Sequence, residues 1–336
     1  MIVTLTANPS LDRTVDLDGP LVRGAVHRAG AASVDPGGKG INVARVLHRT
    51  GHDVLAVLPG NPRDPLLAAL DERGIRYHAV PTSGHARTNI TIAESDGTTT
   101  KLNEPGAPCS AATRTELLAA VVANAAADGW VVLSGSLPPG VPDAFYADVV
   151  RALRPTGCRV AVDTSDSPLL ALAAAFPNAA PDLIKPNSDE LAQLTGSDAK
   201  TLEHDAALGN VGPVAKAGRM LLTQGVGAVL ATLGRAGAVL ITPDGAWRAT
   251  PPPVVTRSTV GAGDSSLAGY LIAERAGAAP ADRLRCAVAY GSAAVALPGT
   301  RIPGPDSVEP SAVSIEPIPD DPLPSHTAHS PLPKDM

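Results

Sequence analysis

The sequence predicts an α/β protein: a doubly wound, mostly parallel sheet flanked by helices, with a small β lid. Three observations support this fold. From about residue 113 short apolar strands alternate with helices, two polar β segments precede that alternation, and 44% of the 336 residues are hydrophobic. Strands that alternate with helices favour parallel pairing. This composition can bury a large core, so global disorder is excluded.

The alternating part is expected to place ligands at one edge of its sheet. In doubly wound sheets, ligands bind beyond the carboxyl ends of the strands, so the chemistry should lie in the loops there. The predicted elements are, in order, helix 117–127, strand 130–133, a helix from Pro142, strand 159–163, helix 168–175, strand 182–185 and helix 188–194.

The two earlier β segments run over residues 12–35 and 87–101 and show no helical period. In the second, β-branched residues alternate with polar ones around Asp96-Gly97, which is typical of a hairpin with one solvated face. We expect these segments to form a small sheet standing off the main body.

The chain is predicted to hold one folded domain over residues 1–302, followed by a disordered tail over 303–336. Nine prolines fall in the last 34 residues, and no periodic apolar face accompanies them. Such a segment has too few apolar residues to join a core.

Charge and composition exclude several classes of partner. The net charge is −6 and only 2% of residues are aromatic, so neither nucleic acid nor a membrane surface is an expected partner. The three cysteines are far apart and odd in number, which indicates neither a disulfide framework nor a zinc site. The amino terminus reads as a strand rather than a signal peptide, so a cytoplasmic location is expected.

The strongest local motif is Ser-Thr-Val-Gly-Ala-Gly-Asp-Ser-Ser at 258–266, directly before an apolar helix. Small residues let the N–H groups of Gly261, Ala262 and Gly263 converge at a helix N-terminus, where an anion is favoured. Asp264 beside such a cradle could accept a proton from an attacking hydroxyl. The alternative is a glycine-rich turn in which Asp264 is only the helix N-cap.

A second motif, Pro-Gly-Gly-Lys-Gly-Ile-Asn-Val-Ala-Arg-Val-Leu at 36–47, also opens a helix. Lys39 supplies a cation, and Asn42 can hydrogen-bond a polyol through both amide atoms. The run is not a Walker P-loop and does not fit a dinucleotide-binding GxGxxG motif. A purely structural glycine turn remains the alternative.

Three more runs follow or join predicted strands. They are Ser-Gly-Ser-Leu-Pro-Pro-Gly at 134–140, Lys-Pro-Asn-Ser-Asp-Glu at 185–190 and Thr-Leu-Gly-Arg-Ala-Gly at 232–237. Each run also has a purely structural interpretation. The first could be a turn and the third a hairpin turn, and in the second Asn187 could be a helix N-cap with Glu190 as its capping-box partner.

Taken together and in this order, the five runs resemble the PfkB (ribokinase-like) family of carbohydrate kinases over residues 1–302. Three runs are most similar to its phosphosugar branch, and within it to bacterial 1-phosphofructokinases. They are Asn-Pro-Ser-Leu-Asp at 8–12, Gly-Gly-Lys-Gly at 37–40 and Arg87-Thr-Asn89, which Ala86 precedes. Relatives with a lid lysine carry it near position 25, where this chain has Ala25 followed by His27 and Arg28.

The resemblance implies a role for each matching position. Asp264 would be the general base, and the N–H groups of Gly261, Ala262 and Gly263 would stabilise the moving phosphoryl group. ATP and Mg²⁺ would be the cofactors, with Glu190 at the metal. The remaining positions are Asp12, Gly38, Asn42 and Ser136 for sugar hydroxyls, Lys39 and Arg87 for the acceptor's phosphate, and Lys185, Asn187, Thr232, Gly234 and Gly237 for the nucleotide.

The resemblance also implies a reaction, ATP-dependent phosphorylation of a sugar phosphate, with fructose 1-phosphate converted to fructose 1,6-bisphosphate. Tagatose 6-phosphate or fructose 6-phosphate is the alternative acceptor, and a non-catalytic sugar-phosphate sensor is a distant alternative. The lid would close over the sugar and could serve as the interface of a homodimer.

Overall fold

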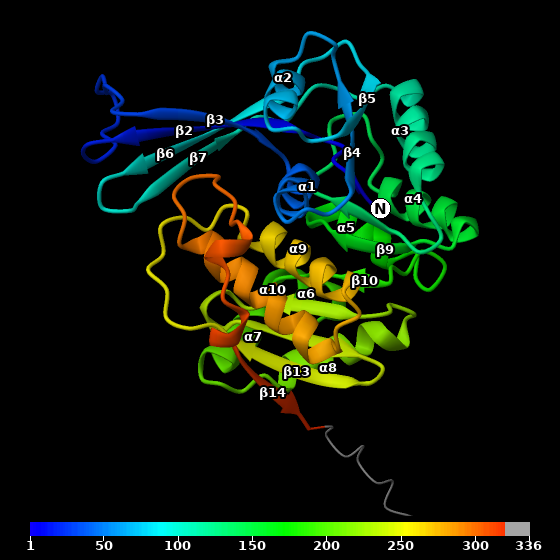
Figure 1. Ribbon diagram of the computed structural model, residues 1–336. Coiled ribbons are helices and arrows are strands. Elements are labelled where there is room, and N and C mark those ends of the chain that lie inside the picture. Colours follow the sequence, from blue (N-terminus) through cyan, green and yellow to red (C-terminus); the bar gives the residue numbers. More distant parts are fainter. Residues whose placement is uncertain (320–336) are drawn as a thin grey trace, which may run out of the picture.

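The computed structural model describes residues 1–319, and within them the larger sheet has ten strands (Figure 1). Its order is β14-β13-β12-β11-β10-β9-β8-β1-β4-β5, parallel from β11 to β5 and antiparallel from β11 to β14. The prediction of a mostly parallel sheet is confirmed. The strands are β1 Ile2–Leu5, β4 Val54–Gly60, β5 Tyr77–Pro81, β8 Trp130–Ser134, β9 Arg159–Asp163, β10 Leu183–Ile184, β11 Val229–Thr232, β12 Ala238–Thr242, β13 Gly245–Thr250 and β14 Ser314–Ile318.

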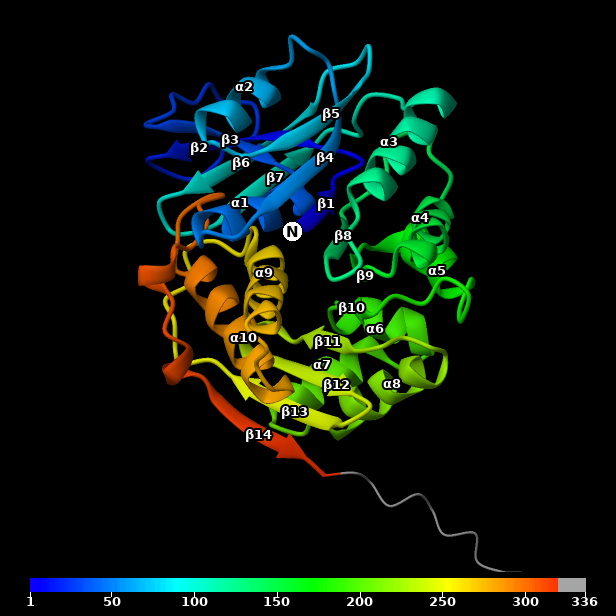
Figure 2. The ribbon, with the colours of Figure 1, turned by 45° about the vertical axis from the view of Figure 1, so that its right-hand side comes forward.

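Helices cover both faces of this sheet (Figure 2). Successive residues of a strand point to opposite faces, so Val54 and Ala56 pack into one apolar cluster and Leu55 and Val57 into another. The first cluster lies under α1 Lys39–Arg49, α2 Pro65–Glu72, α9 Ala262–Arg275 and α10 Pro280–Val295. The other face carries α3 Ala111–Asn124, α4 Phe145–Leu153, α5 Asp166–Ala173, α6 Ser188–Thr195, α7 Ala199–Ala207 and α8 Gly212–Thr223.

The second sheet projects from the body, with order β3-β2-β6-β7 (Figure 1). It comes from the two segments expected to form a separate small sheet, although residues 18–31 contribute no strand to it. We call it the small sheet. Its strands are β2 Ser10–Leu17, β3 Ala32–Gly37, β6 Arg87–Glu94 and β7 Thr99–Asn103.

The folded part extends beyond the boundary predicted at residue 302, and that prediction is wrong for residues 303–318. Val313 is buried in the core beneath α10, and β14 pairs with β13 from Ser314 to Ile318. Pro317 is tolerated because β14 is an edge strand, where a missing N–H removes no required ladder bond. The rest of the predicted tail, residues 320–336, lies outside the described part.

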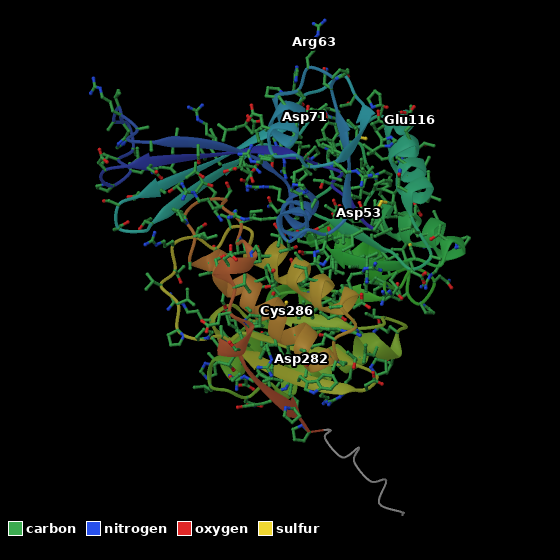
Figure 3. The ribbon with its side chains drawn as sticks, viewed as in Figure 1. Asp53, Arg63, Asp71, Glu116, Asp282 and Cys286 are labelled. Carbon is green, nitrogen blue, oxygen red and sulfur yellow. The ribbon has the colours of Figure 1, made fainter. Side chains whose placement is uncertain are left out.

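Acidic side chains lie exposed on the outer helices. Asp71 near the end of α2, Glu116 on α3 and Asp282 on α10 are all exposed (Figure 3). Of the helices in residues 1–319, none is both long and apolar enough to cross a membrane.

Candidate active site

Helix α1 begins at the carboxyl edge of the sheet, immediately after the glycine run. Its N-cap, Gly38, has φ 102°, a region that favours glycine. A Cβ at Gly38 would lie 2.6 Å from the methyl carbon of Thr6, so the close approach also requires glycine. This turn brings Lys39 and Asn42 to the first turn of α1.

Helix α9 begins in the same region, and its N-cap is Gly261 with φ 74°. Asp264 therefore lies in the first turn, and the interpretation of Asp264 as the N-cap is wrong. Among residues 1–319, the N–H of Gly263 has no backbone acceptor. The helix start thus presents the N–H of Gly263 beside a carboxylate, whereas the N–H of Ala262 donates to the carbonyl oxygen of Thr259 at 3.4 Å.

Asp264 is buried and hydrogen-bonded to the other signature motif. Nδ2 of Asn42 donates to Oδ2 of Asp264 at 2.9 Å, whereas Oδ1 of Asp264 has no hydrogen-bond partner within the described part of the chain. Burial and the nearby charge of Asp163 raise the pKa of Asp264 to about 6. A carboxyl group with such a pKa and one open oxygen can act as a general base near neutral pH.

Two lysines flank this base, and both are paired with Asp163 at the end of β9. Nζ of Lys39 lies 2.9 Å from Oδ1 of Asp163, and Nζ of Lys185 lies 3.1 Å from Oδ2. Burial opposes ionisation of Asp163, but the two ammonium groups outweigh it and keep its pKa below the usual value. The charge of Asp163 in turn raises the pKa of Lys39.

Lys185 lies against the helix start of α9. A Cβ added at Gly263 would be 3.1 Å from Nζ of Lys185, so glycine allows the ammonium group to approach the first turn of α9. The site therefore holds two cations, a helix N-terminus and a buried carboxylate within a short range. This combination suits an anionic group that reacts with a hydroxyl.

Asn187 and Glu190 form a capping box, which was the structural alternative to a role in ligand binding. Oδ1 of Asn187 accepts from the N–H of Glu190 at 2.8 Å, and Oε2 of Glu190 accepts from the N–H of Asn187 at 2.9 Å. Oε1 of Glu190 has no hydrogen-bond partner in residues 1–319. Burial raises the pKa of Glu190. The cap leaves one carboxylate oxygen of Glu190 available.

The run at 232–237 joins β11 and β12 as a tight hairpin turn with a short 3₁₀ segment at Gly234–Ala236. Its first residue, Thr232, forms a parallel bridge with Asn187. Gly234 and Gly237 both have positive φ, which the turn requires. The run is thus a hairpin turn, as its structural interpretation has it, and it also lies beside the Lys185–Glu190 segment.

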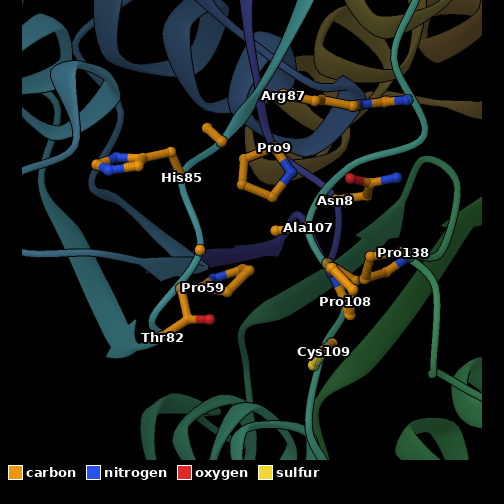
Figure 4. A pocket seen from close by; sticks show the side chains of 13 residues that line it. Asn8, Pro9, Pro59, Thr82, His85, Arg87, Ala107, Pro108, Cys109 and Pro138 are labelled. Atoms are coloured by element: carbon orange, nitrogen blue, oxygen red, sulfur yellow. The ribbon is translucent and has the colours of Figure 1, made fainter.

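Arg87, Ser136 and Asn8 form a second group of predicted and neighbouring residues. Oγ of Ser136 accepts from Nη2 of Arg87 and Nδ2 of Asn8, each at 3.4 Å. Arg87 also donates to the carbonyl oxygen of Glu104 at 3.1 Å. Arg87 and Asn8 line a small pocket together with Pro9, His85 and Pro138 (Figure 4).

Asp12 lies at the root of the small sheet. Its Oδ1 accepts from Oγ of Ser10 at 2.7 Å and from Nδ2 of Asn89 at 3.0 Å. A Cβ at Gly37 would be 2.2 Å from Oδ2 of Asp12, so only glycine at this position leaves room for the carboxylate. The predicted residues therefore fall into two groups, one around Asp264 and Asp163 and one around Arg87 and Asp12.

Sequence reasoning missed Asp163, which contacts two of the predicted residues. It lies outside every glycine-rich run, so no motif marked it. An available signal was its place as the last residue of the predicted strand 159–163, at the sheet edge where ligands bind.

Comparisons with known proteins identify the family of the chain. The family model described as pfkB family carbohydrate kinase matches residues 5–307. The chain is 37% identical over 274 residues to a 1-phosphofructokinase of Xanthomonas campestris pv. campestris, covering 81% of this chain and 83% of that protein. It is 32% identical over 313 residues to an ATP-dependent 6-phosphofructokinase isozyme 2 of Mycobacterium tuberculosis, covering 92% and 88%.

Among solved structures, phosphofructokinase-2 of Escherichia coli in complex with substrates and products superimposes with a TM-score of 0.82. The two sequences are 30% identical, and the match covers 91% of this chain and 96% of the other. The expected resemblance is thus confirmed over nearly the whole folded part. With its paired signatures joined by Asn42 and Asp264, the chain belongs to the pfkB family of carbohydrate kinases.

Proposed function

We propose that this kinase transfers the γ-phosphoryl group of ATP to the 6-hydroxyl of fructose 1-phosphate, giving fructose 1,6-bisphosphate and ADP. The observation that carries the chemistry is the buried Asp264, held by Asn42 at the N-terminus of α9. The preference for fructose 1-phosphate is supported by the 37% identity to a 1-phosphofructokinase.

In the proposed reaction Asp264 accepts the proton of the sugar hydroxyl through its open Oδ1. The hydroxyl oxygen bonds to the γ-phosphorus while the bond to the β–γ bridging oxygen breaks and ADP leaves. General-base assistance of this kind contributes about 10²–10⁴-fold. The pKa of about 6 keeps Asp264 mostly ionised at pH 7.

In this proposal, the N–H groups of Gly261, Ala262 and Gly263 and the ammonium group of Lys185 stabilise the negative charge on the oxygens of the phosphoryl group in transfer. Lys39 joins them in this proposal, because its ammonium group pairs with Asp163 beside Lys185. The resemblance had implied that Lys39 faces the acceptor's phosphate. Asp163 thus orients two cations toward the same group.

Mg²⁺ would be held at Glu190, where the residues present fit it. The open Oε1 supplies one hard oxygen ligand, and no cluster of three or more metal-binding side chains occurs in residues 1–319. Mg²⁺ commonly takes one or two carboxylates and completes its shell with water and phosphate oxygens. When bound there, it would neutralise charge on the nucleotide phosphates.

Arg87 and Ser136 are assigned to the phosphate and nearby hydroxyl of the acceptor. Arg87 points its guanidinium group at Ser136, and a guanidinium can bind phosphate through two parallel hydrogen bonds. Asp12, Gly38 and Asn42 are assigned to the sugar hydroxyls. For Asn42 this role falls to its second amide hydrogen, since the first donates to Asp264.

The nucleotide is proposed to bind along two neighbouring segments, the one that follows β10 and the turn that follows β11. Lys185 and Asn187 lie on the first, and Thr232, Gly234 and Gly237 on the second. The bridge between Asn187 and Thr232 keeps the two side by side.

The small sheet is proposed to act as the lid over the sugar and as the interface of a homodimer. The sheet and the loop between β2 and β3 carry exposed apolar side chains, among them Val34 and Leu102 on the strands and Val26 in the loop, at 50%, 55% and 88% exposure. Burying such side chains against a second copy would be favourable. Light scattering should give the mass of a dimer, and a V26D/V34D variant should give a monomer. A cytoplasmic location is proposed on the three free cysteines.

A second acceptor has specific support. The similarity to a 6-phosphofructokinase isozyme 2 and to phosphofructokinase-2 favours fructose 6-phosphate, and tagatose 6-phosphate presents a related arrangement. Both would use the same base and cradle. A non-catalytic sensor is disfavoured by the intact Asp264 and Lys185.

The deciding experiment measures ADP release with fructose 1-phosphate, fructose 6-phosphate and tagatose 6-phosphate under ATP and Mg²⁺. The highest kcat/KM is expected for fructose 1-phosphate, with D264N as the blank. A higher value for either 6-phosphate would move the assignment to that acceptor. Sugar-phosphate binding without turnover of any of the three would indicate a sensor.

A further inference from the structure

Arg45 is a buried cation inside the 36–47 motif, at a position for which no role is predicted. It lies on α1, three residues after Asn42, and only 5% of its side chain is exposed. Burial lowers the pKa of its guanidinium group, so holding the charge there costs free energy. A leucine or methionine would fill such a helix position without that cost.

The contacts of Arg45 lead directly to the catalytic centre. Nη1 of Arg45 donates to Oδ1 of Asn42 at 3.2 Å and to the carbonyl oxygen of Pro36 at 3.1 Å. Nη2 lies 3.2 Å from Oδ1 of Asp35, on the small-sheet strand β3. The same Asn42 amide donates to Asp264 through Nδ2.

We propose that Arg45 is a positioning residue for the catalytic base, because it fixes which end of the Asn42 amide faces Asp264. An Asn side chain has one end that donates and one that accepts. Arginine only donates, so Oδ1 of Asn42 must face Arg45 and the NH₂ group must face the carboxylate. A reversed amide would place its oxygen against Asp264 and repel it. The inference rests on the proposed role of Asp264.

Asp35 anchors Arg45, and this anchor belongs to the small sheet. It also accepts from Nη2 of Arg73 at 2.7 Å and from Oγ1 of Thr300 at 2.9 Å. In the β2–β3 pairing, Asp35 lies opposite Asp12, the proposed sugar ligand. The chain of contacts therefore runs from the root of the small sheet through Arg45 and Asn42 to the base.

Arg45→Met tests the inference, and Arg73→Met is its matched control. Both substitutions remove one guanidinium partner of Asp35, but only Arg45 touches Asn42. We expect R45M to lower kcat at least about tenfold, the scale of one hydrogen bond to a charged group. KM for ATP and for the sugar phosphate should change much less, and R73M should keep nearly wild-type kcat.

The pH profile separates positioning from a general loss of structure. Asp264 is faced by Asp163 from β9, by Lys39 and Asn42 from α1 and by Lys185 after β10. The Asn42 hydrogen bond lowers the pKa of Asp264, so its loss in R45M should move the acidic limb of kcat/KM to higher pH. An unmoved limb with an unchanged kcat would overturn the inference.

A double-mutant cycle shows whether Arg45 acts through Asn42. In an N42A background, R45M should lower kcat little further, because the group it orients is gone. Full additivity would contradict the proposal. Arg45→Lys guards against a folding defect, because it keeps the charge beside Asp35 but not the forked donor; it should recover melting temperature and not kcat.

A measurement that needs no catalytic turnover tests the role of Arg45 independently of the proposed reaction. In wild type and R73M, the side-chain amide resonance of Asn42 should show slow hydrogen exchange, and in R45M that protection should be lost. If the wild type phosphorylates none of the three sugars, the proposed function fails while this result still decides the role of Arg45. Equal protection in R45M and wild type would overturn it.

Discussion

Asn42 and Asp264 are joined by a hydrogen bond of 2.9 Å although 222 positions separate them in the sequence. The bond connects the first turns of α1 and α9, which pack against each other. One carboxylate oxygen is thereby oriented, and the other remains open. The two family signatures are thus joined by a hydrogen bond rather than being two separate glycine turns.

Asp264→Asn should lower kcat at least about 10²-fold, since it removes the general base. The helix start and Lys185 remain, so the Kd for ATP should stay within about threefold. Steady-state kinetics and calorimetric ATP titration check both values. A variant that keeps more than a third of the wild-type kcat would remove Asp264 from the mechanism.

The pKa of Asp264 predicts the acidic limb of the pH profile. Asp264 must be ionised to accept a proton, so kcat/KM should fall as pH falls through about 6, with a slope of one proton. Buffers of constant ionic strength from pH 5 to pH 8.5 cover this range. A flat profile down to pH 5 would contradict the raised pKa.

Stability provides an independent check on the same pKa. Its value is raised from 3.8 to about 6, so the folded state holds this proton more tightly than the unfolded state. Stability from this group is present below pH 4 and is lost as pH rises through about 6. D264N, which carries no charge there, should therefore be more stable than wild type at pH 7.5. Urea unfolding at pH 5 and pH 7.5 should show that advantage shrinking toward acid.

Arg87 and Lys39 are expected to act on different phosphates. Arg87→Ala should raise the KM for fructose 1-phosphate about tenfold or more, given the strength of hydrogen bonds to charged groups. Lys39→Ala should mainly lower kcat, because Lys39 pairs with Asp163 beside Lys185. The effects on kcat/KM should then be nearly additive in the double variant. Strong non-additivity would restore the interpretation that both residues share the acceptor's phosphate.

Much of the fold followed from hydrophobic periodicity, and the site followed from glycine spacing. The predicted strand 159–163 is β9 itself, and helix 188–194 is α6 to within one residue. The contacts of Asp163 and Arg45 could not be foreseen. Asp163 lies off every motif, and its partner Lys39 is 124 positions away, so only the packing of α1 against β9 brings them together. Arg45 lies inside the 36–47 motif and its partners are near in sequence, but no pattern in the sequence showed that its side chain is buried against Asn42 and Asp35.

Glu190→Gln should shift the Mg²⁺ dependence of the reaction to higher concentration with little change in sugar KM. The amide oxygen can still accept from the N–H of Asn187, so the capping box survives, but an NH₂ group, which cannot bind Mg²⁺, replaces the open oxygen. Activity titrated with Mg²⁺ at fixed ATP measures the shift. An unchanged titration would leave Glu190 as a helix cap only.

The carboxyl-terminal strand should contribute measurably to stability, contrary to the disordered tail expected from its prolines. A chain ending at Ala312 loses Val313 and Ile315 from the core and leaves β13 as an unpaired edge. It also removes the carbonyl oxygen of Val313 that accepts from Arg285 at 2.7 Å. Removing Val313, Ile315 and the half-buried Ile318 costs about 2–5 kcal/mol, so the melting temperature should fall by several degrees. A chain ending at Pro319 keeps β14 and is the matched control, expected to melt with the full-length protein. Equal melting of both truncations would show that β14 adds nothing to the stability of the sheet.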